Sequence, residues 1–344
     1  MKTLHTIAEM RAACAAARRG RKRLGFVPTM GALHEGHLSL VRAARGRCDA
    51  VAVSIFVNPT QFAPNEDFSK YPRSFERDRD LLEAEGVDLL FSPSVEEMYP
   101  PGAATFVTVE GLSEKLCGRS RPGHFRGVTT VVAKLFNIVE PDLAFFGQKD
   151  AAQTVIVRKM VRDLGLPVEI AVCPIVREPD GLAMSSRNAY LDAAQRRSAT
   201  VLHRALQRVQ ELAAKGERQA AALMEAARRV FSEEPSVRVD YVEIVDNETL
   251  DPVADVSPGA LVAVAAYLGA TRLIDNIVIR LLDDAGGVLR QEVAKLFEFD
   301  AREKPHHLPL IAETSQGRAV MQMLPRAACR TKPLSMEPHG EPSR

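Results

Sequence analysis

Short apolar runs alternate with amphipathic stretches along the first half of the chain. Six runs have the length and composition of buried β-strands: Leu24–Pro28, Val51–Phe56, Asp88–Phe91, Phe106–Val109, Asp142–Phe146 and Val168–Cys173. Four stretches between them have the character of helices and are followed by Gly, Pro or Asp: Gly36–Arg45, Phe75–Glu85, Arg126–Val139 and Asp150–Leu164. This alternation is typical of a parallel sheet covered by helices. It predicts an α/β fold with a Rossmann-like domain over residues 1–175.

The pattern changes after residue 176. Apolar residues recur at helical spacing between residues 202 and 212 and again between 220 and 231, which predicts two helices. Three strand-like runs follow, at Val237–Val245, Leu261–Ala266 and Ile274–Ile279. The pattern therefore predicts a second, smaller α+β domain over residues 176–282.

The last part of the chain, residues 283–344, lacks a clear period. Its end, residues 333–344, is rich in proline and polar side chains, a composition typical of disorder. One amphipathic helix fits Gly287–Phe299, where the apolar side chains fall near one face. We expect a C-terminal extension that is partly disordered.

Composition and charge restrict the class of protein. The 344 residues are 46% hydrophobic and 26% charged, with a formal net charge of +1. This is typical of a globular protein and gives no electrostatic footprint for duplex nucleic acid or an anionic membrane. The five cysteines include no CxxC pair, no secretory signal is evident, and the apolar stretch 260–270 is too short to span a bilayer. We expect a cytoplasmic protein that acts on small molecules.

Candidate chemistry gathers where the first predicted strand meets the first predicted helix. Ligands of open parallel sheets bind beyond the carboxyl ends of strands, where a helix N-terminus offers free N–H groups to a phosphate. His34 and His37 are three residues apart, so both rings can point to the same side if the helix begins near Gly36. Imidazoles with a pKa near neutrality could donate to a phosphate and carry charge in an anionic transition state.

Two alternatives stay open for the histidine pair. A His-x-x-His pair at a turn is often a surface feature, and a zinc site is the functional rival. The metalloprotease helix places its histidines at i and i+4, whereas His34 and His37 are one residue closer, and the sequence offers no third ligand cluster. The spacing disfavours zinc.

Five segments carry a resemblance to a known family. His34-x-Gly36-His37 resembles the HIGH motif of the adenylating nucleotidyltransferases. The five segments, in chain order, are Phe26–His37, Ser54–Phe62, Arg121–Gly127, Phe145–Asp150 and Gly181–Asn188. Together they resemble the pantothenate synthetase family of pantoate–β-alanine ligases. The resemblance covers about residues 1–280.

The resemblance implies an ATP-dependent ligase that uses Mg²⁺ and forms a homodimer. The pantoate carboxylate would attack the α-phosphate of ATP, pyrophosphate would leave, and the amine of β-alanine would then displace AMP. The implied catalytic residues are His34, His37, Lys149 and Arg187. The implied ATP-binding residues are Met30, Gly31, His34, His37, Gly147, Lys149, Asp150, Val176, Met184, Ser185, Ser186 and Arg187. Gln61 and Gln153 are implied to bind pantoate, with Gln61 also at β-alanine, and no side chain is assigned to the metal.

Lys149 and Asp150 also have a physical interpretation. They follow the apolar run Asp142–Phe146 at a second strand end, which suits Lys149 to a phosphate and Asp150 to the ribose hydroxyls. The alternative for Lys149 is a solvated surface charge. Strand-end position favours the functional interpretation.

The segment Met184–Arg187 resembles the KMSKS loop of the same superfamily. Its hydroxyls and guanidinium suit a polyphosphate. From spacing alone, an ordinary helix-cap serine pair is equally compatible. Gly181 indicates that the loop can move.

The assignment of Gln61 and Gln153 to pantoate depends on the resemblance, because glutamine is usually a surface residue. A neutral amide could orient a hydroxy acid and leave its carboxylate nucleophilic.

Other functions stay open: a HIGH-type transferase for phosphopantetheine or nicotinate mononucleotide, a truncated tRNA synthetase, or a non-catalytic nucleotide-binding regulator. The balanced charge disfavours the tRNA enzyme, and the absence of GxxxxGK[ST] disfavours a P-loop ATPase.

Overall fold

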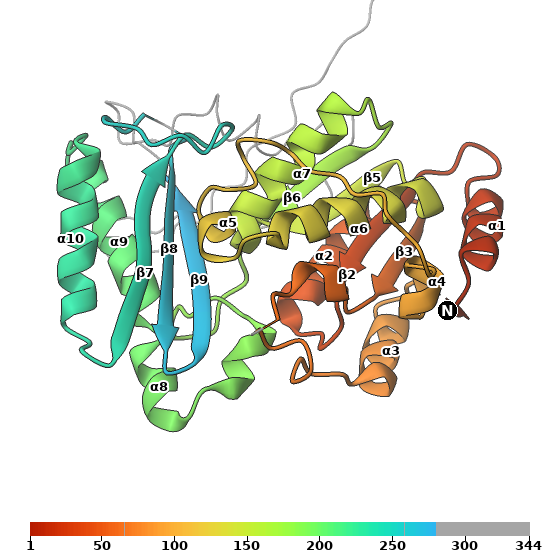
Figure 1. The fold of residues 1–344 in the computed structure, drawn as a ribbon, viewed down its shortest axis with the longest axis horizontal. Coiled ribbons are helices and arrows are strands. Elements are labelled where there is room, and N and C mark those ends of the chain that lie inside the picture. Colours follow the sequence, from red (N-terminus) through yellow and green to blue (C-terminus); the bar gives the residue numbers. More distant parts are fainter. Residues whose placement is uncertain (65, 258, 280–344) are drawn as a thin grey trace, which may run out of the picture. The chain divides into compact units, whose positions relative to one another are not determined.

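The computed structural model describes residues 1–64, 66–257 and 259–279. The first part of the chain forms a six-stranded sheet of parallel strand pairs (Figure 1). The sheet order is β1-β4-β3-β2-β5-β6. The strands are β1 Lys2–Leu4, β2 Leu24–Thr29, β3 Ala50–Ile55, β4 Leu89–Phe91, β5 Leu143–Gly147 and β6 Glu169–Cys173. The strand order reverses between β2 and β5, and this confirms the predicted Rossmann-like fold.

Helices cover both faces of this sheet. They are α1 Ile7–Ala17, α2 Glu35–Arg47, α3 Phe75–Ala84, α6 His124–Val139 and α7 Ala151–Asp163, with short helices α4 Val95–Met98 and α5 Cys117–Ser120. Along β2, Phe26 belongs to the buried cluster of α1, α6 and α7, whereas Val27 belongs to that of α2 and α3. Burial on both faces explains why the parallel strands read as continuous apolar runs.

The second part of the chain forms an antiparallel sheet of three strands. Its elements are β7 Val237–Val245, β8 Leu261–Leu268 and β9 Thr271–Val278, preceded by α8 Ala193–Ser198, α9 Val201–Ala214 and α10 Ala220–Ser232. Val262 and Val264 of β8 pack with α9 and α10, whereas Ala263 and Ala265 join the buried cluster of α6 and α7. The predicted α+β arrangement is confirmed, and the predicted domain boundary near residue 175 stays a prediction.

The predicted strand Phe106–Val109 is wrong. The segment is extended, but within the described residues no strand pairs with it. The N–H of Val107 donates to Thr130 Oγ1 at 3.0 Å, and its carbonyl accepts from Thr129 Oγ1 at 2.6 Å. Hydroxyls of α6 thus take the place of a neighbouring strand. Conversely, β1 was not predicted, because three residues are too few for a period.

A C-terminal extension and the lack of a membrane-spanning segment were also expected from the sequence. The extension 283–344, including the predicted helix Gly287–Phe299, lies outside the described residues. In the part of the chain that the structure describes, every helix is too short or too polar to cross a membrane.

Helix α6 is in direct backbone contact with the short helix η1 (Pro59–Gln61). A Cβ atom added to Gly127 would lie 2.3 Å from the carbonyl oxygen of Thr60. The Asn58 side chain crosses the same contact and donates from Nδ2 to the Gly127 carbonyl at 3.1 Å. The contact sets the position of Gln61 relative to α6.

We expect Gly127→Ala to destabilise the protein by about 1–3 kcal/mol, because the added methyl group forces the two backbones apart. Gly46→Ala in α2 is the matched control, since an added Cβ there meets nothing within 4 Å. The control should stabilise by about 0.5–1 kcal/mol, the usual effect of alanine in a helix. Urea denaturation measures both, and a stabilised Gly127→Ala variant would contradict the close contact.

Candidate active site

A buried carboxylate holds the loop between β2 and α2. Gly31 and Ala32 have positive φ values of 81° and 50°, which turn the chain sharply. Asp78 of α3 is 1% exposed and accepts the N–H groups of Ala32 at 2.7 Å and Leu33 at 2.9 Å. These hydrogen bonds fix the loop just before α2 begins.

Helix α2 is capped by histidine side chains. His34 Nδ1 accepts the N–H of Gly36 at 3.2 Å, and His37 Nδ1 accepts the N–H of His34 at 3.3 Å. Because each Nδ1 is an acceptor, each neutral ring carries its proton on Nε2. The ring centroids are 4.1 Å apart, so the rings lie together as the three-residue spacing predicts.

Burial keeps both imidazoles neutral. Burial, followed by the charge of Lys149, lowers the pKa of His34 to about 4. Burial, followed by the proximity of His34 and Lys149, lowers the pKa of His37 to about 3. The expectation of near-neutral pKa values is therefore wrong for the substrate-free site. At neutral pH the rings offer Nε2–H donors without a positive charge.

The two histidines line a cavity of about 220 Å³ that also reaches the carboxyl end of β5. Most of the predicted site residues line it: Met30, His34, His37, Gln61, Gly147, Lys149, Asp150, Gln153, Val176, Met184 and Arg187. Gln61 is only 8% exposed, and the Lys149 side chain is 22% exposed. Neither residue is therefore a solvated surface group.

Gly31, Ser185 and Ser186 do not line this cavity. Ser185 Oγ accepts the N–H of Arg187 at 3.3 Å and caps the short helix η3 (Ser186–Tyr190). Ser186 Oγ donates to the carbonyl of Ala32 at 3.1 Å and so connects this segment to the histidine loop. In the substrate-free structure both serines have structural partners.

Gly181 has a specific packing role. Its φ is +91°, and a Cβ atom there would lie 2.1 Å from Cδ2 of His203. Its carbonyl also accepts from Nη1 of Arg177 at 2.9 Å. Backbone conformation and close packing therefore both require glycine, and the expected movement of the loop stays a prediction.

A polar network around Gln61 was not predicted. Asn58 is 1% exposed, donates from Nδ2 to Gln61 Oε1 at 3.1 Å and accepts from the Tyr99 hydroxyl at 2.9 Å. Gln61 Nε2 lies 2.9 Å from Met30 Sδ, and His124 Nδ1 donates to the Gln61 carbonyl at 2.8 Å. Asn58 and His124 both lie in segments that carry the family resemblance, so the signal was present.

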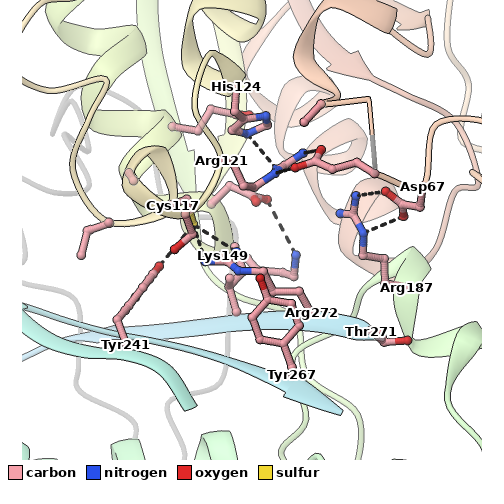
Figure 2. A pocket seen from close by; sticks show the side chains of 18 of the residues that line it. Asp67, Cys117, Arg121, His124, Lys149, Arg187, Tyr241, Tyr267, Thr271 and Arg272 are labelled. Atoms are coloured by element: carbon pink, nitrogen blue, oxygen red, sulfur yellow. Dashed lines mark hydrogen bonds and ion pairs between the residues drawn. The ribbon is translucent and has the colours of Figure 1, made fainter. Parts of the chain in front are cut away.

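Two arginines of the site pair with consecutive acids. Arg187 Nε and Nη2 each lie 3.0 Å from an oxygen of Asp67 (Figure 2). Arg121 Nε and Nη2 lie 2.7 and 2.5 Å from the two oxygens of Glu66. Burial would raise the pKa of each acid, but the hydrogen bonds and charge of its arginine lower the pKa overall. Arg121 and the two acids were not predicted from the sequence.

A second compartment of about 810 Å³ adjoins the first (Figure 2). Six residues line both compartments, which makes them one continuous cleft: Arg121, His124, Lys149, Asp150, Gln153 and Arg187. Tyr241 of β7 and Arg272 of β9 line the second compartment. Arg272 Nη2 pairs there with Asp240 at 2.7 Å.

Strand β9 holds two of the cleft's loops in place. Asp275 is 3% exposed and pairs with Arg177 at 2.6 Å. Asn276 Nδ2 donates to the carbonyls of Gln148 and Lys149, both at 2.9 Å, and so fixes the short helix η2 (Gln148–Asp150). The antiparallel sheet thereby positions the lysine of the parallel sheet.

The fold and the cleft define a class of protein. A His-x-Gly-His turn follows β2, at the point where the strand order of a parallel sheet reverses. Neutral donors, a lysine and two arginines line one cleft there. This arrangement is typical of nucleotide-dependent enzymes of the HIGH type.

Comparison with known families shows to which family of this class the chain belongs. The family model described as pantoate-beta-alanine ligase matches residues 2–278. A pantothenate synthetase of Koribacter versatilis (strain Ellin345) is 62% identical over 287 residues, which cover 83% of this chain and 99% of that protein. The chain belongs to the pantoate–β-alanine ligase family.

Solved structures agree with this assignment. A crystal structure of pantothenate synthetase from Thermus thermophilus has a TM-score of 0.77 and 52% identity, covering 81% of this chain and 99% of that chain. A pantoate-beta-alanine ligase from Francisella tularensis, complexed with beta-gamma ATP and beta-alanine, has a TM-score of 0.67 and 33% identity, covering 81% and 97%.

The buried histidines predict a pH dependence of stability. As pH falls below about 6.5, the unfolded chain binds protons at His34 and His37 while the folded chain does not, so the free energy of unfolding should fall. His34→Gln removes one such group. The difference between wild type and variant should change by about 2 kcal/mol between about pH 7 and pH 4.5. Urea denaturation at several pH values measures it, and parallel curves would contradict the neutral assignment.

Proposed function

We propose that the chain joins pantoate to β-alanine in two steps. A carboxylate oxygen of pantoate bonds to the α-phosphorus of ATP, and the bond to pyrophosphate breaks. The amine of β-alanine then bonds to the acyl carbon of pantoyl adenylate, AMP leaves, and the nitrogen loses its extra proton. Support comes from family membership and from the cavity that brings His34, His37, Lys149 and Gln61 together.

The proposed roles follow from charge. His34 and His37 present Nε2–H donors, and Lys149 and Arg187 add positive charge, where the leaving pyrophosphate becomes more anionic. The proposed nucleotide contacts are those expected from the resemblance: Met30, Gly31, His34, His37, Gly147, Lys149, Asp150, Val176, Met184, Ser185, Ser186 and Arg187. The hydrogen bonds to Asp67 use Nε and Nη2 of Arg187, which leaves the donors of Nη1 for a phosphate.

Pantoate is proposed to bind between Gln61 and Gln153. Both amides line the inner cavity. Asn58 and Met30 contact the side-chain amide of Gln61, and His124 bonds to its backbone carbonyl, so the amide is preorganised. A fixed neutral amide can orient the hydroxyl groups of pantoate and leave the carboxylate free to attack.

Mg²⁺ is proposed to accompany ATP. In the described part of the chain no group of three or more His, Cys, Asp or Glu side chains could hold a metal ion. Mg²⁺ commonly binds through substrate phosphates and water with one or two carboxylates. Asp150, whose side chain is 48% exposed, lines the cleft and is proposed for the ribose hydroxyls, so no side chain is assigned to the ion. The ion would neutralise charge on the triphosphate.

The choice of acid separates this function from its rivals. Incubation of the protein with ATP and single acids should release pyrophosphate with pantoate and not with nicotinate mononucleotide. Release with nicotinate mononucleotide would contradict the proposed substrate. Binding of ATP without formation of AMP, in the presence of both substrates, would indicate a non-catalytic regulator.

We expect His37→Ala and Lys149→Ala each to slow pyrophosphate release about 100-fold or more, because each removes a preorganised group that acts on the transition state. Single-turnover release from ATP and pantoate is the measurement, with circular dichroism to confirm folding. Lys22→Ala, at an exposed lysine, is the control and should match wild type. Wild-type rates in either site variant would refute the role of that side chain.

A homodimer in the cytoplasm completes the proposal. Four cysteines of the described residues, Cys14, Cys48, Cys117 and Cys173, are free thiols, which supports a reducing compartment. The segment 103–108 is extended and almost fully exposed, and its sequence has the character of a strand. Within the described residues no strand pairs with this segment, whose Val107 bonds to hydroxyls of α6, so its other side is suited to pairing with a second copy.

Sedimentation should give the mass of two chains of 37.7 kDa. Thr108→Pro removes an exposed backbone N–H from the unpaired segment and should weaken self-association, whereas Thr108→Val keeps the N–H and should not. A Thr108→Pro variant with unchanged dimer affinity would exclude this segment from the interface.

A further inference from the structure

Arg121 occupies the junction of the two compartments. It precedes α6, its side chain is 15% exposed, and it lines both the inner cavity and the larger compartment. One N–H of its Nη2 donates to the Gln61 carbonyl at 3.3 Å. The guanidinium therefore lies beside the residue proposed to hold pantoate, on the side where the cleft widens.

His124 orients this guanidinium. The ring donates from Nδ1 to the Gln61 carbonyl at 2.8 Å, which leaves Nε2 without a proton in the neutral form. Nη1 of Arg121 lies 3.1 Å from that Nε2 and donates to it. Burial, with the charge of Arg121, lowers the pKa of His124 to about 4, so the ring stays neutral and does not repel the arginine.

Glu66 binds Arg121 in the way that the carboxylate of a small ligand would. Its two oxygens face Nε and Nη2 at 2.7 and 2.5 Å, the parallel arrangement in which arginine binds carboxylates. The pair is not fully enclosed, since the side chains are 15% and 21% exposed. A substrate carboxylate that enters the larger compartment can replace Glu66 without leaving Arg121 unpaired.

The other cations of the cleft are less suited to a second carboxylate. Lys149 and Arg187 are already proposed to contact phosphate. Arg272 is bound by Asp240 through Nε at 3.0 Å and Nη2 at 2.7 Å, and lies beside the buried Cys117. Arg121 is the arginine of the described cleft that adjoins the Gln61 backbone and faces both compartments.

The second step brings in a substrate that carries a free carboxylate. β-Alanine presents its amine to the acyl carbon while its carboxylate lies two methylene groups away. With pantoate in the inner cavity as proposed, and β-alanine entering through the larger compartment, that carboxylate would lie toward the junction of the two. A fixed guanidinium at the junction would both bind the acid and aim the amine at the adenylate.

We propose that Arg121 binds the carboxylate of the amine substrate and that Glu66 occupies this position until the substrate arrives. The proposal rests on the proposed two-step reaction and adds the basis of its selectivity for an amine that carries an acid group. Arg121 would act in the second step alone, after pantoyl adenylate has formed.

The test compares two nucleophiles on the same intermediate. Single-turnover pyrophosphate release from ATP and pantoate first establishes that the adenylate forms. Its capture is then measured with β-alanine and with hydroxylamine, a neutral nucleophile without a carboxylate. Arg121→Gln should lower kcat/KM for β-alanine about 10- to 100-fold, mainly through KM, and leave hydroxylamine capture within about 2-fold of wild type.

Three further variants identify the cause. Glu66→Gln breaks the same ion pair from the other side, so a purely structural role for the pair predicts the same defect, whereas our proposal predicts that β-alanine capture is retained. Lys70→Gln removes an exposed positive charge from the larger compartment and controls for general electrostatics. Arg121→Lys keeps the charge without the fork and should recover part of the β-alanine activity.

Several outcomes would overturn the proposal. Equal losses with β-alanine and hydroxylamine would show that Arg121 positions the adenylate, and unchanged β-alanine capture would show that it binds no substrate acid. A matching defect in Glu66→Gln or Lys70→Gln would assign the effect to structure or to net charge. Absence of pyrophosphate release in the wild-type protein would instead refute the proposed function, which distinguishes the two failures.

Discussion

The active-site cleft depends on an imidazole that serves as a helix cap. His34 Nδ1 accepts a backbone N–H at the start of α2, and His37 Nδ1 accepts the N–H of His34. The capping contacts fix which nitrogen of each ring carries the proton, and burial keeps the rings uncharged. Local backbone structure thereby sets the chemistry: two donors face the cavity because their opposite nitrogens are committed to the helix. Asp78, which holds the preceding loop, is part of the same arrangement.

Ion pairs hold the loops of the cleft in defined positions. Buried or half-buried guanidinium groups require partners, because an unpaired charge in a protein interior is costly. Here Glu66 and Asp67, consecutive residues of one loop, supply partners for Arg121 and Arg187. Internal carboxylates thus pair with the arginines at positions where anionic groups of substrates are proposed to bind. Because one loop supplies both acids, the ion pairs of both arginines depend on the position of that loop.

Local sequence features were sufficient for part of this structure. The longer parallel strands were predictable because burial on both faces leaves continuous apolar runs, and the adjacency of His34 and His37 follows from helical spacing. The segment Phe106–Val109 was mispredicted because strand propensity does not specify a neighbouring strand. The lowered histidine pKa values depend on burial by distant segments. The pair Arg121–Glu66, 55 residues apart, depends on tertiary contacts that no local pattern encodes.

Pairing of the cations also shapes the electric field outside the protein. Lys149, Arg121, Arg187 and Arg272 each lie beside an acidic side chain. Opposite charges at contact distance produce a field that decays quickly, and physiological salt screens what is left within about 8 Å. Anionic ligands are thus not drawn in from afar as they would be by an open basic funnel. A ligand that reaches the cleft meets cations that are already paired with internal carboxylates.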